Sequence, residues 1–258
     1  MNLPALPPEI DERREAARIL LARRRARSGL IPFACHSSPS FQTPAHIAAL
    51  AEILEAVERG DEKRVIIAMP PRHGKSLLTS RIFPVWAMGR TPGLEVVCSS
   101  YSAELAADNS RAARMLARSG ECAEIFPALQ SGADQRDLDQ VGKWQAGEST
   151  YTAVGVGGSL TGRGADIAII DDPFKDWESA CSPRLRETVW DWYQAVLLTR
   201  LSPAGRVVVV ATRWHPDDLS GRLIAEGGWH VHHMPAIAED GAALWPERWD
   251  AEKLAQVR

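Results

Sequence analysis

Arg64-Val65-Ile66-Ile67-Ala68-Met69-Pro70-Pro71-Arg72-His73-Gly74-Lys75-Ser76 is the stretch on which the predicted fold depends. Its apolar, β-branched run ends at two prolines, the chain bends at Gly74, and Lys75 and Ser76 then open a predicted helix. This is the layout of a phosphate-binding loop, in which backbone N–H groups at a helix N-terminus face the anion, a lysine reaches the β- and γ-phosphates, and a hydroxyl binds Mg²⁺. The usual pattern, G-x-x-x-x-G-K-[ST], has a glycine where this chain has Met69, so the match is incomplete.

The composition is that of an ordinary globular protein. With 258 residues, of which 45% are hydrophobic and 24% charged, the chain can bury one large α/β core or two small ones. The net charge of -3 gives no overall basic signature, so any contact with DNA has to be local. No signal peptide is recognisable and no run of about 18 apolar residues occurs, so we expect no membrane span. The cysteines lack metal-site spacing, which favours a reducing, cytoplasmic location: Cys35, Cys98, Cys122 and Cys181.

The first 60 residues predict two helices. Residues 9–28 form a charged helix, and we interpret its run Arg23-Arg24-Arg25 as a solvated face in preference to a nucleic-acid site. A proline-containing loop through residue 39 follows. Pro44 then opens a second helix, which ends near Gly60.

Downstream of the loop, apolar strands alternate with helices. Strands are predicted at 64–69, 94–100, 149–156, 165–172 and 206–212, and helices at 77–88, 103–116 and 183–201. Pro84 predicts a kink or an early stop in the first of these helices. Residues 127–143 are expected to be irregular, residues 157–164 to form a glycine-rich turn, and residues 254–258 to lie inside a last helix. The pattern indicates an α/β protein with a mainly parallel sheet and helices on both faces.

One predicted strand ends in two acids, Asp171 and Asp172. Asp171 would hold Mg²⁺ together with the Ser76 hydroxyl, and Asp172 would orient the water that attacks a phosphate. Aspartate is shorter than the glutamate usual at the second position, and Glu178 is the nearest acid that could assist it. The alternative is that Asp-Asp-Pro only ends the strand and starts a turn.

Several other polar residues have a functional and a structural interpretation. Arg72 could contact the γ-phosphate, whereas His73 is expected to shape the loop. Thr212, at a strand end, could sense the γ-phosphate and its neighbour Arg213 could carry that signal outward, while Asp217 could cap a helix that starts at residue 218. Candidates for an arginine that neutralises the transferred phosphoryl group, each also explicable as an ion-pair residue, are Arg111, Arg114 and Arg163. We expect no metal site at His230, His232 and His233, because only the first and second share a strand face.

Six motifs in order resemble one family: Phe41-Gln42-Thr43-Pro44, Pro70-Pro71-Arg72-His73-Gly74-Lys75-Ser76, Ser99-Ser100-Tyr101-Ser102, Gly162-Arg163-Gly164-Ala165-Asp166, Ile170-Asp171-Asp172-Pro173 and Ala211-Thr212-Arg213-Trp214-His215. Together they are similar to the ATPase half of the large terminase subunit of tailed bacteriophages, the motor that pumps DNA into the procapsid. The resemblance implies a P-loop NTPase fold of the ASCE type, with ATP as substrate and Mg²⁺ as cofactor. It also implies double-stranded DNA, a portal protein, a small terminase subunit and a homo-oligomeric ring as partners, in the cytoplasm of a bacterial host.

The resemblance assigns roles to matching residues. Phe41 and Gln42 match the segment that contacts adenine. The phosphate loop runs from Pro70 to Ser76, with Arg72 and Lys75 as its catalytic cations. Ala211-Thr212-Arg213 matches the motif that couples hydrolysis to domain movement. Arg111 or Arg114 is expected to act on a neighbouring subunit.

The resemblance also divides the chain. We expect a helical extension at 1–38, the ATPase domain at 39–235, and at 236–258 the start of a linker toward a nuclease domain that this sequence lacks. Nuclease activity is therefore not expected of these residues. A helicase-like DNA translocase is the alternative with the same core, although such enzymes usually have an Asp-Glu pair and a second motor domain. A kinase would need an arginine-rich lid, which the sequence does not offer, and a nucleotide-binding prophage remnant would not turn over.

Overall fold

The computed structural model describes residues 8–130, 140–250 and 253–254. They form a seven-stranded sheet in the order β3-β4-β2-β5-β6-β1-β7, in which every pairing is parallel except that of β3 with β4. The strands are β1 Arg64–Ala68, β2 Glu95–Ser100, β3 Lys143–Ala146, β4 Ser149–Gly155, β5 Ala165–Asp171, β6 Leu201–Ala211 and β7 His230–His233. The mainly parallel α/β fold predicted from the sequence is confirmed.

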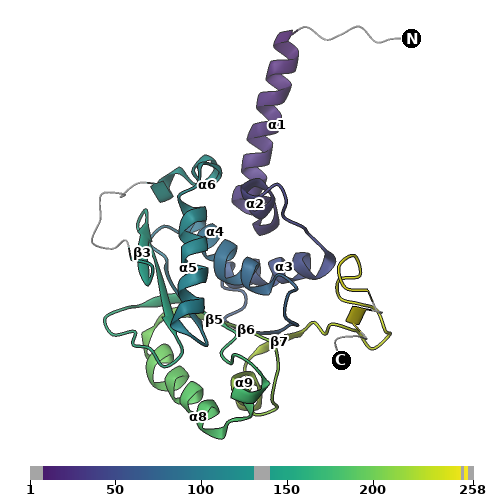
Figure 1. The fold of residues 1–258 in the computed structure, drawn as a ribbon. Coiled ribbons are helices and arrows are strands. Elements are labelled where there is room, and N and C mark those ends of the chain that lie inside the picture. The colour runs from purple at the N-terminus through teal and green to yellow at the C-terminus, as the bar shows by residue number, and fades with distance from the viewer. Residues whose placement is uncertain (1–7, 131–139, 251–252, 255–258) are drawn as a thin grey trace.

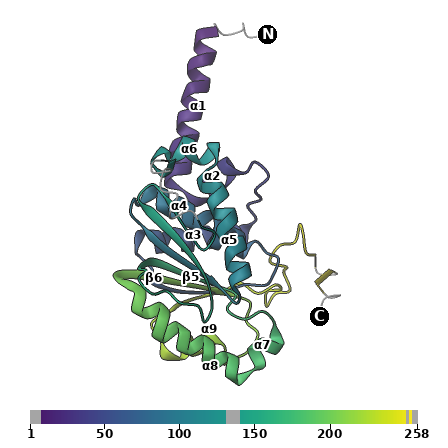
Figure 2. The same ribbon diagram turned by 60° about the vertical axis from the view of Figure 1, so that its left-hand side comes forward.

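Helices cover both faces of the sheet, because the central strands are apolar on both faces. On β1, Val65 and Ile67 pack into one core and Ile66 into the other, and β5 and β6 alternate in the same way. Figures 1 and 2 show the two helical layers. One layer contains α3 Ala45–Arg59, α4 Phe83–Arg90, α5 Ala103–Ala117 and α6 Gly120–Ile125, and the other contains α7 Trp177–Cys181, α8 Pro183–Trp192 and α9 Leu219–Glu226.

The N-terminal region differs from its prediction at one element. α1 Pro8–Ser28 is the expected charged helix and extends away from the body of the molecule (Figure 1). The loop expected before residue 39 is instead a helix, α2 Leu30–Ser37. Its proline falls in the first turn, where the missing N–H costs no helical hydrogen bond. Leu30, Phe33 and Ala34, at helical spacing, are buried in the same core as α3 and β1.

The helix after the phosphate loop also departs from regular geometry. Leu77–Ile82 forms a π-helical turn, η1, and α4 follows with Pro84 in its first turn, so the expected kink takes the form of a change in helix type. The predicted helix at 183–201 comprises α8, a π-helical turn at Tyr193–Leu197 and a 3-10 turn at Leu198–Arg200. The predicted irregular region contains a 3-10 turn at Pro127–Gln130 and the start of β3, and its residues 131–139, like most of the predicted last helix, lie outside the described residues.

The strand order brings the predicted motifs to one edge of the sheet. β6 lies between β1, which leads into the loop, and β5, which ends in the two acids; this is the strand order of the ASCE type. Since the three strands are parallel, their carboxyl ends meet at the same edge, where ligands bind in open α/β sheets. Within the described ranges, no helix is long and apolar enough to cross a membrane.

The packing of α2 generates a stability prediction. Phe33 is fully buried, with its ring centroid 5.5 Å from that of Phe126. Phe33→Ala should lower the free energy of unfolding by about 3–5 kcal/mol, because a large cavity opens in the main core. The control Leu20→Ala, on the exposed part of α1, should change it by less than about 0.5 kcal/mol. Urea denaturation checks both values, and equal stability of the two variants would show that α2 is not part of the cooperative core.

Candidate active site

The loop after β1 has two residues in left-handed conformation. Arg72 has φ 61° and Gly74 has φ 85°. A Cβ at Gly74 would lie 3.0 Å from Cδ1 of Ile47, so glycine is required there by conformation and by space. Met69, at the usual first glycine position, is buried in the core without a positive φ, and its N–H donates to the Ala211 carbonyl at 3.0 Å. The missing glycine therefore costs this loop nothing.

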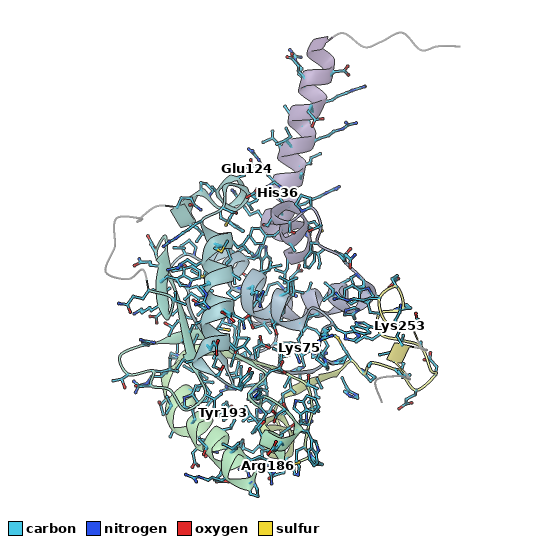
Figure 3. The ribbon with its side chains drawn as sticks, viewed as in Figure 1. His36, Lys75, Glu124, Arg186, Tyr193 and Lys253 are labelled. Carbon is cyan, nitrogen blue, oxygen red and sulfur yellow. The ribbon has the colours of Figure 1, made fainter. Side chains whose placement is uncertain are left out.

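Lys75 joins the ends of three strands. Its Nζ donates to Oδ1 of Asp172 at 2.8 Å and to Oγ1 of Thr212 at 2.6 Å. The N–H of Thr212 donates to the same carboxylate oxygen at 2.9 Å. Figure 3 shows Lys75 in the interior of the body, and its side chain is 5% exposed. An ammonium buried to this degree needs such acceptors to remain charged.

Asp171 is fully buried beside this group. Its carboxylate accepts hydrogen bonds from Ser76 Oγ at 3.0 Å, Ser80 Oγ at 2.7 Å and Asn109 Nδ2 at 3.3 Å. Burial, and next the charge of Asp172, raise the pKa of Asp171 to about 6, while the two serine hydroxyls oppose this change. Ser80 and Asn109 were not among the predicted site residues. Ser80 follows Ser76 by one helical turn, a spacing from which its position could have been predicted.

The Ser76 hydroxyl and the Asp171 carboxylate fit Mg²⁺. Both are oxygen donors, and they lie within hydrogen-bond distance of each other. Mg²⁺ prefers one or two carboxylates together with waters and substrate phosphates over a complete protein cage. The described residues contain no group of three His, Cys, Asp or Glu side chains that could hold a metal ion.

The remaining predicted residues are distributed around this centre. Phe41 and Gln42 line a cavity of about 270 Å³ that also contacts Gly74. Glu178, on α7, is exposed. Arg163 precedes β5 and so lies at the sheet edge opposite Asp171, roughly 25 Å away along the strand at about 3.3 Å per residue.

Both α5 arginines lie on the helix that carries Asn109. Arg111 is exposed and pairs with Asp108. Since residues two positions apart on a helix do not share a face, Arg111 points away from the Asn109 side chain and from the acids. Arg114 is half-buried one turn further along the helix.

His73 bonds the loop backbone through one ring nitrogen. Its Nδ1 donates to the Pro71 carbonyl at 2.8 Å, while Nε2 is buried and has no hydrogen-bond partner. The ring stacks on Trp249 with a centroid distance of 6.2 Å. Burial is the main cause that lowers the pKa of His73, and the charges of Arg248 and Lys75 lower it further.

The coupling segment continues from Thr212 into α9. Arg213 Nε donates to Oδ2 of Asp218 at 2.9 Å, and Oδ1 of Asp218 accepts from the Gly221 N–H at 2.8 Å. Asp218 is therefore the N-cap of α9, and the prediction that Asp217 caps this helix was wrong by one residue. The carboxylate of Asp217 points instead to Arg186 and Arg222.

Of the three histidines on β7, His233 lies beside the loop, because it is in register with Ala68 and lines a small cavity with Thr212 and Arg213. His230 Nδ1 and His232 Nε2 lie 3.9 Å and 3.4 Å from the Glu62 carboxylate. The sequence did not indicate Glu62 as their neighbour. Among the described residues, His230, His232 and Glu62 are not a group that could hold a metal ion.

Comparison with known proteins identifies the family. The family "Terminase large subunit, T4likevirus-type, N-terminal" matches residues 66–256. The chain belongs to this family. A terminase large subunit of Enterobacteria phage T3 is 30% identical to this terminase chain over 191 residues, which are 72% of the chain and 32% of the relative. The crystal structure of the HK97 bacteriophage large terminase superposes with a TM-score of 0.51 at 16% identity, covering 83% of this chain and 44% of the other, and shows the same fold. The chain thus spans about a third of the curated relative that it matches.

The buried His73 gives the loop a pH dependence. The pKa of His73 is lower in the folded chain than its ordinary value of 6.5, so near and below pH 6.5 the unfolded chain binds more protons. The stability that the neutral ring contributes is therefore complete above pH 6.5 and is lost as the pH falls from that value toward the folded pKa. We expect His73→Met to flatten the fall in Tm between pH 7.5 and pH 5.5 relative to the unmutated chain. Other groups, His46 among them, titrate in both proteins. The difference between the two plots of Tm against pH therefore reports on His73. Identical slopes in thermal melts would contradict a neutral, buried His73.

Proposed function

We propose that the chain is the ATP-hydrolysing part of a large terminase subunit, and that its turnover drives double-stranded DNA into a phage procapsid. The observation that carries the proposal is the convergence of Lys75 and Ser76, from the loop after β1, with Asp171 and Asp172 at the end of β5. A single triphosphate at this edge can contact both pairs. Membership of the terminase family supports DNA packaging as the purpose of that turnover.

In this proposal the loop holds the phosphates and the acids prepare the attack. Backbone N–H groups of the loop and the Lys75 ammonium bind the β- and γ-phosphates, and Arg72 approaches the γ-phosphate from the loop. Ser76 and Asp171 would hold Mg²⁺, which when bound would supply positive charge beside the phosphate oxygens. Asp172, whose side chain is 26% exposed, orients the attacking water and accepts its proton. Glu178 would take this role only if α7 moved toward the loop.

The bond between Lys75 and Asp172 gives a physical route for coupling. A γ-phosphate competes with Asp172 and Thr212 for the Lys75 ammonium, since all three are acceptors. Binding of the γ-phosphate would therefore free the Asp172 carboxylate to contact water. It would also release Thr212, the residue that follows β6. Arg213, which is bonded to the N-cap of α9, would carry the change outward.

The proposed partners follow from the family and not from a recorded contact. They are double-stranded DNA, a portal protein, a small terminase subunit and further copies of the chain in a ring, in the cytoplasm of the host. Arg111 or Arg114 would reach the phosphates of the next copy, and of the two Arg111 is the exposed one, on the side of α5 away from the acids of its own chain. We assign no cutting of DNA to the described residues.

Replacing the loop lysine tests the assignment of an ATPase. Lys75→Ala should abolish phosphate release from ATP, because the β- and γ-phosphates lose their principal cation. The matched control is Lys63→Ala, an exposed lysine at the opposite end of β1, which should retain full turnover. The two variants are compared by phosphate release after folding has been checked by circular dichroism. Undiminished turnover in Lys75→Ala would contradict the proposed site.

Turnover should also depend on assembly and on DNA. A monomer should hydrolyse ATP slowly, since an arginine supplied by a neighbour is worth roughly 10³-fold or more in rate. Rates measured against protein concentration, with and without double-stranded DNA, should rise with both. Stimulation by single strands alone would favour the helicase-like translocase, and binding without turnover under all conditions would favour the prophage remnant.

A further inference from the structure

The cavity of about 270 Å³ beside the phosphate loop has walls from both ends of the chain. Phe41 and Gln42 precede α3, and Gly74 and Leu77 belong to the loop and the turn after it. Trp245 and Arg248 also line the cavity. These two residues belong to the C-terminal segment, residues 236–249, which lies beside α3 in Figure 1.

A histidine of α3 lies between the C-terminal segment and the loop. The ring nitrogens of His46 lie 3.1 Å from the carbonyl oxygens of Leu244 and His73, so one imidazole contacts the segment and the loop together. The centroid of the His46 ring lies 5.2 Å from that of Trp245, which is buried. Within the segment, the Leu244 N–H donates to the Ala236 carbonyl at 3.0 Å and closes the turn.

Arg248 completes the outer wall. Its guanidinium lies 5.1 Å from the centroid of the Trp245 ring, within the range of a cation–π contact. The cavity is therefore lined by a planar cation supported by a buried tryptophan, and by the Phe41 ring and the Gln42 amide. Such a combination suits a flat, nitrogen-containing ring, since stacking uses the faces of the ring and the amide can bond its edge. The volume lies just below the range of about 300–1,000 Å³ for drug-sized ligands, which suits one fused ring system.

We propose that the C-terminal segment forms the outer wall of the nucleoside site, with Trp245 and Arg248 holding the purine base of the nucleotide whose phosphates occupy the loop. This inference rests on the proposed function. The base then bridges the residues before α3 and the C-terminal segment. Nucleotide binding consequently tightens the segment against the loop, whereas a phosphate chain without a base does not.

Comparing ADP with pyrophosphate in the presence of Mg²⁺ tests the contribution of the base. By isothermal titration, Arg248→Ala should weaken ADP binding about 10-fold, the equivalent of about 1.4 kcal/mol for a desolvated cation–π contact, and change pyrophosphate binding less than about two-fold. Trp245→Ala should weaken ADP binding further. Arg222→Ala is the matched control, because Arg222 also lies over a tryptophan, 5.7 Å from the ring of Trp190, but away from the cavity. It should bind both ligands like the unmutated chain.

Hydrogen exchange provides a second readout that does not depend on a substitution. ADP should slow exchange of the amides of residues 236–249 in the unmutated chain, and pyrophosphate should not. If ADP and pyrophosphate both bind but Arg248→Ala leaves the difference between them unchanged, or ADP fails to slow this exchange, the inference is overturned and the phosphate site stands. If the unmutated chain binds neither ligand, the proposed function itself fails, and the inference with it.

Discussion

The Lys75 ammonium is the group on which the rest of this structure depends. A charge with only 5% of its side chain exposed is costly unless acceptors surround it, and here they come from the ends of two other strands, Asp172 after β5 and Thr212 after β6. The lysine therefore fixes the loop after β1 relative to the ends of β5 and β6. Removing one acceptor would leave a buried charge poorly compensated. The same property makes the arrangement sensitive to an incoming phosphate, which is a stronger acceptor.

The two adjacent acids have different environments although they share a peptide bond. Asp172 faces the lysine, whereas Asp171 turns the other way, into serine hydroxyls and the Asn109 amide. Hydroxyl and amide donors stabilise a carboxylate less than an ammonium does, so burial and the neighbouring charge prevail and raise the pKa of Asp171 to about 6. A divalent cation beside Asp171 would remove this cost, which is a physical reason for this acid to bind metal.

Backbone strain is concentrated at the same edge of the sheet. Among the described residues, the non-glycine positions with positive φ are Arg72 in the loop and Asp172 after β5, at 61° and 47°. Conformations of this kind cost about 1–3 kcal/mol each and persist where surrounding contacts over-determine them. For Asp172 those contacts are its bonds to Lys75 and to the Thr212 N–H. The strained turn directs the carboxylate toward the loop instead of along the strand.

Much of the fold could be predicted because its signals are local. Alternation of apolar runs with helical periodicity predicted the parallel sheet, and the prolines, Gly74 and Lys75 predicted the loop. Errors arose where burial prevailed over local preference, as in α2, whose proline suggested a loop but whose Leu30, Phe33 and Ala34 pack into the core. The N-cap of α9 was misplaced because Asp217 and Asp218 are chemically equivalent until Arg213 pairs with one of them.

Only the tertiary structure decided which distant residues share the site. The sequence by itself determined the phosphate loop, the pair of acids and the order of the strands along the chain. It could not indicate that Asn109 bonds Asp171, or that Trp245 and Arg248 line the same cavity as Phe41. These contacts join segments up to about 200 residues apart, and their formation depends on how the sheet is ordered and how its helices pack, a property of the whole chain that no short stretch encodes.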